Sequence, residues 1–341
     1  MVKPPEKYAD TPKAREGALS RLMLSQDALS AVLDAVRVRG QTVFLSQPKQ
    51  NFSISFPDGM RTVHIVEQGS VSVQLTSVEA PIVLNQGDLI LLAHGKSHTF
   101  SDHSGQPHKA LADVVTETFD DENRILGTGE TTRWLTGTYT FDQVLGRRLL
   151  EVLPPAIVLR GQLGRPLNWL DQSIRFILLE AQNHEPGNVV MISRLLDLIL
   201  IRVLRTWASS DEAGPGWLRG AMDKQIGKVL TAIHTRPEDP WTVRELAELA
   251  FMSRSTFAAR FQQLVGHSPA DYVTTCKMDR AMDLLRLGDT PVYDIAERVG
   301  YQSPASFTRA FQKRVNLTPN QWRQKHRADN EGEIVLASGD A

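Results

Sequence analysis

The sequence is poor in cysteine and in long apolar runs. Cys276 is the only cysteine among 341 residues, which excludes a disulfide within one chain and a zinc module with several cysteine ligands. The longest purely apolar run, Leu89 to Ala93, is far shorter than the roughly 20 residues that cross a bilayer. No apolar signal core follows Met1, so we expect a cytoplasmic protein with no membrane contact.

Charge of one sign is not in excess over the whole chain, but it is unevenly distributed. The 38 Lys and Arg residues nearly balance 39 Asp and Glu residues. From Trp217 to Arg327 the count is 17 basic and 11 acidic, a net charge of +6, so the remainder carries 21 and 28, a net charge of −7. This asymmetry predicts a C-terminal module that faces a polyanion.

The length of the chain predicts two domains, because one hydrophobic core seldom grows to this size. Short alternating runs separated by glycine turns fill residues 42–115 and predict a small β-barrel or sandwich. Helical spacing of apolar residues follows, and a Ser- and Gly-rich stretch begins at Ser209. We therefore expect an α+β protein with a β-barrel and helical domain, a linker, an all-α domain and a flexible tail, over residues 17–208, 209–222, 223–324 and 325–341.

Helical spacing predicts four helices outside the last third, over residues 19–36, 147–153, 167–181 and 192–207. Segments of the last three resemble the helical part of a sensory module and imply a dimerisation segment. We expect a homodimer on this ground, although an amphipathic helix is also the usual form of a core helix.

The strongest signal is an internal repeat with an offset of about 50 residues. Phenylalanines spaced i,i+4 recur in both copies, as Phe257 with Phe261 and Phe307 with Phe311. Phe251 is matched with Tyr301, and a slip of one residue further upstream matches Ala247 with Ala296. Each copy has the pattern of a short helix, a turn and a second helix, which predicts helix-turn-helix units at about 243–264 and 291–314.

These residues resemble the DNA-binding region of the AraC/XylS family of bacterial transcription regulators. The stretch from about Asp223 to Arg323 carries the resemblance, in Trp241–Val243, Met252–Phe257, Gly266–Tyr272, Ile295–Tyr301 and Ser306–Phe311. The family implies two helix-turn-helix units joined by a helix, here Pro269 to about Leu287. It also implies that both recognition helices enter successive major-groove segments on one DNA face, about 34 Å apart.

The buried phenylalanines define which positions of each recognition helix face outward. We expect the DNA-contacting residues of the first copy to be Arg254, Ser255, Thr256, Ala258, Ala259, Arg260 and Gln262. Those of the second copy are Ser303, Pro304, Ala305, Ser306, Thr308, Arg309 and Gln312.

Arg309 is the strongest candidate for reading a base. A guanidinium group can donate two bonds to guanine O6 and N7, which discriminates by about 1–3 kcal/mol. Thr308 suits a thymine methyl group or a base edge, whereas Ala259 replaces the arginine in the first copy. We expect base readout mainly in the second copy and phosphate contacts from Arg254 and Arg260. A phosphate contact or a surface salt bridge stays open as the alternative for Arg309.

Residues 40–110 resemble the cupin-type sensory domain. The segment from Gly87 to His98 follows the cupin pattern Gly-x5-Pro-x-Gly-x2-His, with alanine in place of proline. The resemblance implies an effector pocket in a β-barrel, which we assign to His64, Glu67, His94 and His98. Val66 stands where cupin enzymes carry a second metal-ligating histidine, so we expect no metal and no cofactor. Ligation by His64, His98 and Glu67, or by His94, His98 and His103, stays open.

Together these observations predict a sequence-specific DNA-binding transcription regulator that responds to a small-molecule effector and is not an enzyme. Its partners would be double-stranded promoter or operator DNA and, for an activator, RNA polymerase. A cupin-like metalloenzyme or metal sensor with a DNA-binding appendage is the alternative. A DNA-repair methyl acceptor would need a reactive cysteine, whereas we expect Cys276 to be buried in an apolar helix and inert.

Overall fold

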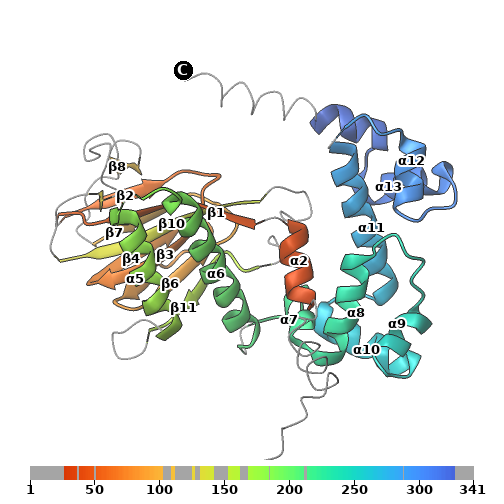
Figure 1. Ribbon diagram of the computed structural model, residues 1–341, viewed down its shortest axis with the longest axis horizontal. Helices are drawn as coiled ribbons and strands as arrows, with labels where there is room; N and C mark the ends of the chain where they lie inside the picture. Colours follow the sequence, from red (N-terminus) through yellow and green to blue (C-terminus); the bar gives the residue numbers. More distant parts are fainter. Residues whose placement is uncertain are drawn as a thin grey trace, which may run out of the picture.

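The computed structural model describes residues 27–36, 38–49, 51–102, 109–111, 125–126, 131–141, 153–161, 168–183, 185–210, 213–286 and 288–326. Figure 1 shows a β-rich N-terminal unit beside an all-helical C-terminal unit. The expected two-domain α+β class is therefore confirmed. Among the described helices, none combines the length and the apolar character needed to cross a bilayer.

Two β-sheets face each other in the N-terminal unit. The six-stranded sheet has the order β11 (Ile157–Leu159), β6 (Leu89–Leu92), β3 (Arg61–Gln68), β10 (Arg133–Phe141), β1 (Val38–Ser46) and β9 (Ile125–Leu126). The five-stranded sheet has the order β5 (Ile82–Asn85), β4 (Ser70–Leu75), β7 (His98–Ser101), β2 (Ser53–Phe56) and β8 (Lys109–Ala110). Neighbouring strands pair antiparallel except for β9 with β1 and β8 with β2.

The alternation of side chains along these strands fills the space between the sheets. Val71, Val73 and Leu75 on β4 all point inward and are buried. They meet aromatic side chains from both sheets, of which Phe56, Phe100 and Trp134 are almost fully buried. A core of this kind explains why the alternating pattern of residues 42–115 folds into two facing sheets.

Helices α5 (Asn168–Asn183) and α6 (Asn188–Ala208) confirm the helices expected at 167–181 and 192–207. Helix α6 lies directly against β1, and its Leu196 also reaches β10. A Cβ atom at Gly40 would lie 2.4 Å from Leu196 Cβ and 2.9 Å from the Ser193 carbonyl oxygen, so this close approach requires glycine at position 40. The Tyr139 hydroxyl donates to the Leu196 carbonyl oxygen at 3.0 Å. The helix expected at 147–153 lies outside the described residues, apart from Leu153.

The C-terminal unit consists of helices arranged at the two ends of one long helix, α11. They are α7 (Trp217–Met222), α8 (Lys224–Thr235), α9 (Val243–Leu249), α10 (Arg254–Val265), α11 (Pro269–Arg286), α12 (Val292–Arg298) and α13 (Pro304–Val315). Residues 319–326 are also helical. The first half of α11 joins one apolar core through Val273, and its second half joins another through Met282. Helix α11 therefore connects two apolar cores. Figure 1 shows it running between α8 to α10 at one end and α12 with α13 at the other.

The segment 209–222, which we expected to be a linker, contains helix α7. The Gly-Pro-Gly sequence ends at Gly216, and the apolar pair that follows it, Trp217 and Leu218, is buried. Helix α2 (Ala28–Val36), the described part of the helix expected at 19–36, packs on α7 and α8. Its Ala28 and Leu29 belong to an apolar core that continues from the sheet helices into the C-terminal unit.

Candidate nucleic-acid interface

The first helix-turn-helix consists of α9 and α10, and hydrogen-bonded caps define where both helices begin. The Glu245 N–H donates to the Thr242 hydroxyl at 3.2 Å, and the Thr242 N–H donates to the Glu245 carboxylate at 2.8 Å. The Ser253 hydroxyl accepts from the Thr256 N–H at 3.3 Å at the start of α10. Gly266, with φ +84°, ends that helix in the left-handed conformation.

The second helix-turn-helix repeats this arrangement with α12 and α13. Ser303 caps α13 by accepting from the Ser306 N–H at 3.2 Å, and Pro304 occupies the first turn, where a proline is tolerated. Asn316 ends the helix with φ +58°. Both recognition helices therefore have capped starts, which fixes the positions of their first outward side chains.

The inner faces of the two recognition helices are nearly identical. Phe257 and Phe261 are fully buried, and so are Phe307 and Phe311. In each pair the ring centroids are 5.6 Å apart. The sequence-based assignment of buried and outward faces is confirmed at these four positions.

The turns of the two copies differ in length, which corrects one match in the repeat. The Phe251 N–H donates to the Glu248 carbonyl oxygen and the Gly300 N–H donates to that of Glu297, and both residues have positive φ. Phe251 therefore corresponds to Gly300 rather than to Tyr301. The second turn is one residue longer, and this insertion is the origin of the slip seen in the repeat.

The outward residues form an exposed surface on both recognition helices. Ten of the fourteen predicted contact residues are exposed: Arg254, Ser255, Thr256, Ala259, Arg260, Gln262, Pro304, Ala305, Arg309 and Gln312. The other four, which are half-buried, are Ala258, Ser303, Ser306 and Thr308. The hydroxyl groups of Ser303 and Ser306 bond to each other at 3.0 Å, so their first role is local capping.

The arginine side chains of this surface differ in whether they have a partner within the chain. Arg260 forms an ion pair with Asp223 at 2.6 Å. Burial opposes ionisation of Asp223, but bonds from the Ile226 N–H and from Arg260 hold its pKa below the ordinary value. Among the described residues, neither Arg254 nor Arg309 has a hydrogen bond or ion pair to its side chain. Both guanidinium groups are available for an external acceptor.

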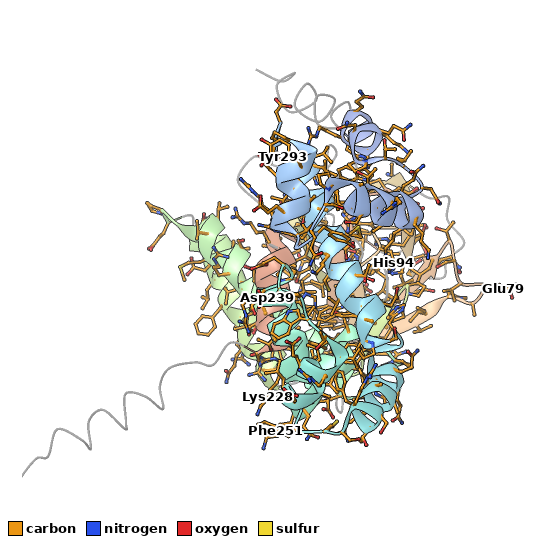
Figure 2. All side chains as sticks on the ribbon, turned by 90° about the vertical axis from the view of Figure 1, so that its right-hand side faces the viewer. Glu79, His94, Lys228, Asp239, Phe251 and Tyr293 are labelled. Atoms are coloured by element: carbon orange, nitrogen blue, oxygen red, sulfur yellow. The ribbon has the colours of Figure 1, made fainter. Side chains whose placement is uncertain are left out.

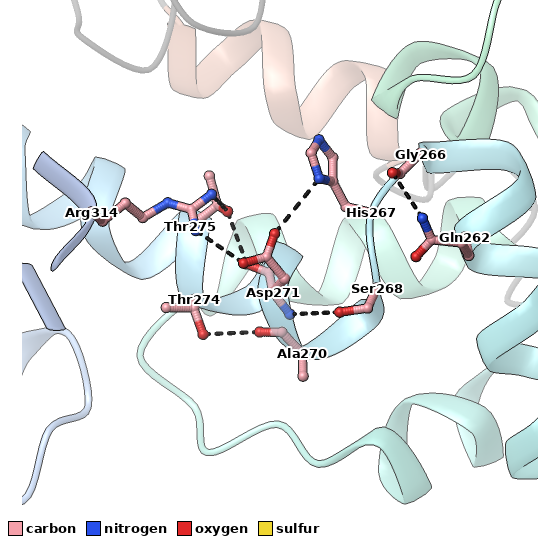
Figure 3. A network of polar contacts seen from close by, with 9 residues as sticks. All are labelled: Gln262, Gly266, His267, Ser268, Ala270, Asp271, Thr274, Thr275 and Arg314. Atoms are coloured by element: carbon pink, nitrogen blue, oxygen red, sulfur yellow. Dashed lines mark hydrogen bonds and ion pairs between the residues drawn. The ribbon is translucent and has the colours of Figure 1, made fainter.

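A polar network ties α13 to the start of α11 (Figure 3). Arg314 donates to the Asp271 carboxylate at 3.0 Å and also to the Thr275 hydroxyl. The other Asp271 oxygen lies 3.6 Å from His267 Nδ1. Arg314 lies on α13 of the second helix-turn-helix, and Asp271 lies in the first turn of the connecting helix α11. The network therefore holds the second unit against the start of the connecting helix. The sequence does not predict this network, because Arg314 and Asp271 are 43 positions apart and belong to no common motif.

Phe251 is the most exposed large apolar side chain among the described residues, at 81%. It lies beside Lys228, whose ammonium group is 5.3 Å from the ring centroid, at one edge of the helical unit (Figure 2). A positive φ is unusual for a large side chain, because Cβ crowds the backbone there.

The barrel histidines were predicted to form an effector pocket, and two of them do meet. His64 Nε2 and His98 Nε2 are 3.0 Å apart, and His64 Nδ1 is 2.9 Å from the Thr136 hydroxyl. The rings also pack against Phe56 and Phe100. Burial, with the charge of His98, lowers the pKa of His64 well below its ordinary value. Burial lowers the pKa of His98 to about 4, so both rings are neutral at pH 7.

Glu67 and His94 are held at other places. Arg133 forms an ion pair with Glu67 at 2.8 Å, and His94 Nε2 is 2.8 Å from the Leu153 carbonyl oxygen. His103 lies outside the described residues. Within the described part of the chain, no three His, Cys, Asp or Glu side chains are grouped to hold a metal ion. The ligand set of His64, His98 and Glu67 is therefore not assembled.

Cys276 is buried on α11, and burial raises the pKa of its thiol well above the ordinary value. A buried, protonated thiol is a poor nucleophile. This environment agrees with the expected inert cysteine and gives no support to the methyl-acceptor alternative.

Comparisons with known proteins agree with this architecture. A protein-family model described as a cupin matches residues 27–209, and one described as a helix-turn-helix domain matches residues 246–325. The putative AraC-like transcription regulator of Streptomyces antibioticus is 31% identical over 262 residues, which cover 76% of this chain and 85% of the relative. The HTH-type transcriptional regulator AlkR of Acinetobacter baylyi is 28% identical over 308 residues, covering 88% and 99%.

Solved structures also resemble parts of the chain. The DNA-binding domain of AdpA, in complex with a target DNA, is 32% identical with a TM-score of 0.30. That match covers 31% of this chain and 96% of the AdpA chain.

Proposed function

The chain belongs to the AraC family of helix-turn-helix transcription regulators with an N-terminal cupin domain, and on this premise we propose how it reads its operator. Its relatives are transcription regulators, not enzymes. In the proposal, α10 and α13 enter successive major-groove segments on one face of the DNA. Base readout is concentrated in α13, and α10 mainly positions the protein on the backbone.

The observation that carries this proposal is the contrast between the two outward faces. Arg309 is exposed on α13 and has no partner among the described residues, whereas Ala259 occupies the corresponding position of α10. A free guanidinium group can donate two bonds to a guanine, but a methyl group can contact only a thymine methyl. Thr308, half-buried beside Arg309, would add one base-edge contact.

The arginines of α10 suit phosphate contacts for a different reason. Arg254 lies in the first turn and has no partner among the described residues, so it would reach a phosphate at no internal cost. Arg260 would have to leave Asp223 or share it. We therefore assign the larger backbone contribution to Arg254.

Selection of bound DNA from a random pool, followed by affinity measurements on the selected site, tests these roles. Arg309→Ala should lower affinity for the selected site by about 1–3 kcal/mol and remove the preference at one base pair. Arg254→Ala should weaken selected and random DNA alike and reduce the salt dependence by about one phosphate contact.

A Lys325→Ala variant, altered near the end of the described chain, serves as a control for loss of positive charge. If Arg309→Ala lowered selected and random DNA affinity by the same factor, the assignment of base readout would be wrong.

We also propose that the regulator acts as a homodimer. Large apolar side chains are exposed on α5 and α6, which pack together: Phe176, Leu179, Val189, Val190, Met191 and Leu198. Met191 and Leu198 are seven positions apart and share one helix face, as an amphipathic seam requires. Sedimentation of wild type and of Leu198→Lys tests this surface, and an unchanged dimer in the variant would exclude it.

The proposed domain boundary lies before α7, so that the DNA-binding domain begins near Ala213 instead of Asp223. The burial of Trp217 and Leu218 against α8 and α10 supports this placement. The sensory domain then comprises the cupin match and its helices, and we propose that a small-molecule effector acts on it.

A further inference from the structure

The two ends of the helical unit each carry an exposed aromatic residue. Phe251 lies at one end, in the turn of the first helix-turn-helix, and Tyr293 lies at the other end, on α12 (Figure 2). They are the two most exposed aromatic side chains among the described residues, and Tyr293 is 61% exposed. We infer that Phe251 of one copy docks beside Tyr293 of a second copy bound in the same orientation on neighbouring DNA.

Phe251 is held outward by a strained backbone, with a cation beside its ring. Residues in sparsely populated backbone conformations gather at functional sites, which points to a use for this ring. Lys228, 5.3 Å from the ring centroid, is exposed and has no hydrogen bond or ion pair within the described part of the chain. Glu248, just before the turn, already faces Arg244 at 3.7 Å. The Phe251 edge, defined by Phe251 and Lys228, therefore presents an aromatic ring with a positive charge.

Tyr293 has an anion beside it instead. Tyr293 and Glu297 are four positions apart on α12, so they share one face of that helix. Both are exposed, and neither side chain has a hydrogen bond or ion pair to another described residue. Arg298 is turned from Glu297 by about 100° around the helix axis. The Tyr293 edge, defined by Tyr293 and Glu297, therefore presents an aromatic ring with a negative charge.

The chemistry of the two edges favours head-to-tail pairing. When the Phe251 edge meets the Tyr293 edge of another copy, the rings bury apolar area that each copy leaves exposed. The Lys228 ammonium group then meets the Glu297 carboxylate. Two identical edges would instead bring like charges together, which is unfavourable. The charges therefore select a contact between opposite ends of two copies.

The length of the helical unit suits such a contact on DNA. Helix α11 has 18 residues and is about 27 Å long, and the helix-turn-helix units lie at its two ends. A second copy that continues the spacing of about 34 Å places its α10 one helical turn beyond α13 of the first. Its Phe251 edge then faces the Tyr293 edge of the first copy. The expected operator is a tandem repeat of about 21 base pairs.

This contact differs from the seam proposed for α5 and α6. It is heterologous and joins copies in the same orientation, whereas the seam relates two copies by a two-fold axis. A weak contact is sufficient, because neighbouring sites hold the two edges at an effective concentration in about the millimolar range. The inference rests on the proposed function for DNA binding by α10 and α13, which a duplex with one site tests separately.

Affinities of the full chain for duplexes with one selected site and with two tandem sites test the contact. In wild type the second tandem site should bind about tenfold more tightly than a lone site, a ratio here called the tandem gain. An insertion of about five base pairs, half a helical turn, should abolish the tandem gain, because it turns the edges to opposite faces of the duplex. Leu198→Lys should keep the gain, since the α5 and α6 seam is not used.

Variants of the two edges should change the tandem gain without changing affinity for one site. Phe251→Asn and Tyr293→Ala should each lower the gain below about twofold. Phe251→Asn also relieves backbone strain, so its loss of gain does not come from misfolding. Val83→Asn, at an exposed apolar position of β5, is the control and should keep the gain.

Exchange of the two charges gives the sharpest test. Lys228→Glu and Glu297→Lys should each lower the tandem gain, because every contact then brings like charges together. The double variant should restore it, because the ammonium and carboxylate groups have only changed places. The gain is a ratio to one-site affinity, so a general effect of charge on DNA binding cancels.

Four results would overturn the contact: no tandem gain in wild type, an equal gain in Phe251→Asn, no recovery in the double charge variant, or loss of the gain in Leu198→Lys. A lower one-site affinity of Phe251→Asn with an unchanged gain would place the ring on DNA instead. Absence of one-site binding by wild type would overturn the proposed function. One-site binding without a tandem gain would overturn only this inference.

Discussion

At the residue scale, Phe251 shows how a local conformation can conflict with the residue that adopts it. Its φ of +54° is common for glycine and tolerated by asparagine, but costs a bulky residue about 1–2 kcal/mol. We expect Phe251→Asn to raise the free energy of unfolding by about 0.5–1 kcal/mol, because the strain is relieved and little packing is lost from an 81% exposed ring. Urea denaturation of both proteins measures the difference.

Phe251→Val is the matched comparison, since it removes the same ring and the same contact with Lys228. A β-branched residue fits the left-handed region worse than phenylalanine, so this variant should be less stable than wild type. Equal stabilities of the Asn and Val variants would show that backbone strain at this turn is negligible.

The buried barrel histidines give the protein a specific sensitivity to acid. The pKa of His98 is about 4 in the folded chain and about 6.5 in the unfolded chain, so between these values the unfolded state binds the extra proton. The contribution of His98 to the free energy of unfolding should be complete above pH 6.5. It should decline as the pH falls toward 4, by up to about 3 kcal/mol. Denaturation midpoints between pH 4 and 7.5 measure the slope.

His64 adds to the same slope, because its pKa is also lowered by burial and by His98. His98→Gln keeps a polar side chain beside His64 and should flatten the profile between pH 4 and 6.5. A profile as steep as that of wild type would assign the acid sensitivity to other groups, such as His234, whose pKa burial lowers to about 4.

At the element scale, the bridge from Arg314 to Asp271 and Thr275 joins α13 to α11. We expect it to set the distance between the DNA segments that α10 and α13 reach. Arg314→Gln should cost about 1 kcal/mol of stability and should also relax the preference for operator spacing. Affinities for the selected operator and for a version lengthened by one base pair measure this preference.

In wild type the longer operator should bind clearly more weakly, because one base pair adds about 3.4 Å and a rotation between the two segments. In Arg314→Gln the ratio of the two affinities should shrink about threefold or more. Arg280→Gln removes an exposed charge from the same helix and is the control. If all three proteins show the same ratio of affinities for the two operators, the bridge contributes to stability but does not set the preferred operator spacing.

Elements with local signals could be predicted from the sequence. Ser253 and Ser303 define the starts of the recognition helices by capping them, and the paired phenylalanines identify the buried faces. The turn match failed because alignment by residue type paired two aromatics, while the backbone pairs Phe251 with Gly300. Helix α7 was missed because its six residues show no periodicity of their own and are held by tertiary packing.

The candidate site could be predicted in outline, but not in its internal contacts. Outward positions such as Arg309 follow from helical spacing alone. The ion pair of Arg260 with Asp223 and the meeting of His64 with His98 depend on segments far apart in the chain, and no periodicity encodes them. Those contacts decide which predicted residues are available to a ligand.

At the scale of the whole molecule, α2 shares an apolar core with α7 and α8, and this core runs between the two units. We expect the full chain to unfold in a single calorimetric transition. Leu29 is 1% exposed within this core, so Leu29→Lys should lower the unfolding temperature and split the transition in two, because it buries a charge without a partner.

Val83→Lys, at an apolar position that is 42% exposed on β5, controls for the added charge. It should melt as wild type does. Two transitions in wild type itself would show that the units unfold independently despite their shared core.

The position of α2 also has a consequence for biosynthesis. A ribosome completes residues 28–36 long before it adds the partner helix at Lys224–Thr235. At about 5–20 residues per second, roughly 10–40 s pass between the two events. During that interval the apolar side of α2, with Leu29, has no partner helix to cover it. Chaperone capture of unfinished chains should therefore depend on Leu29 and should stop once α8 has emerged.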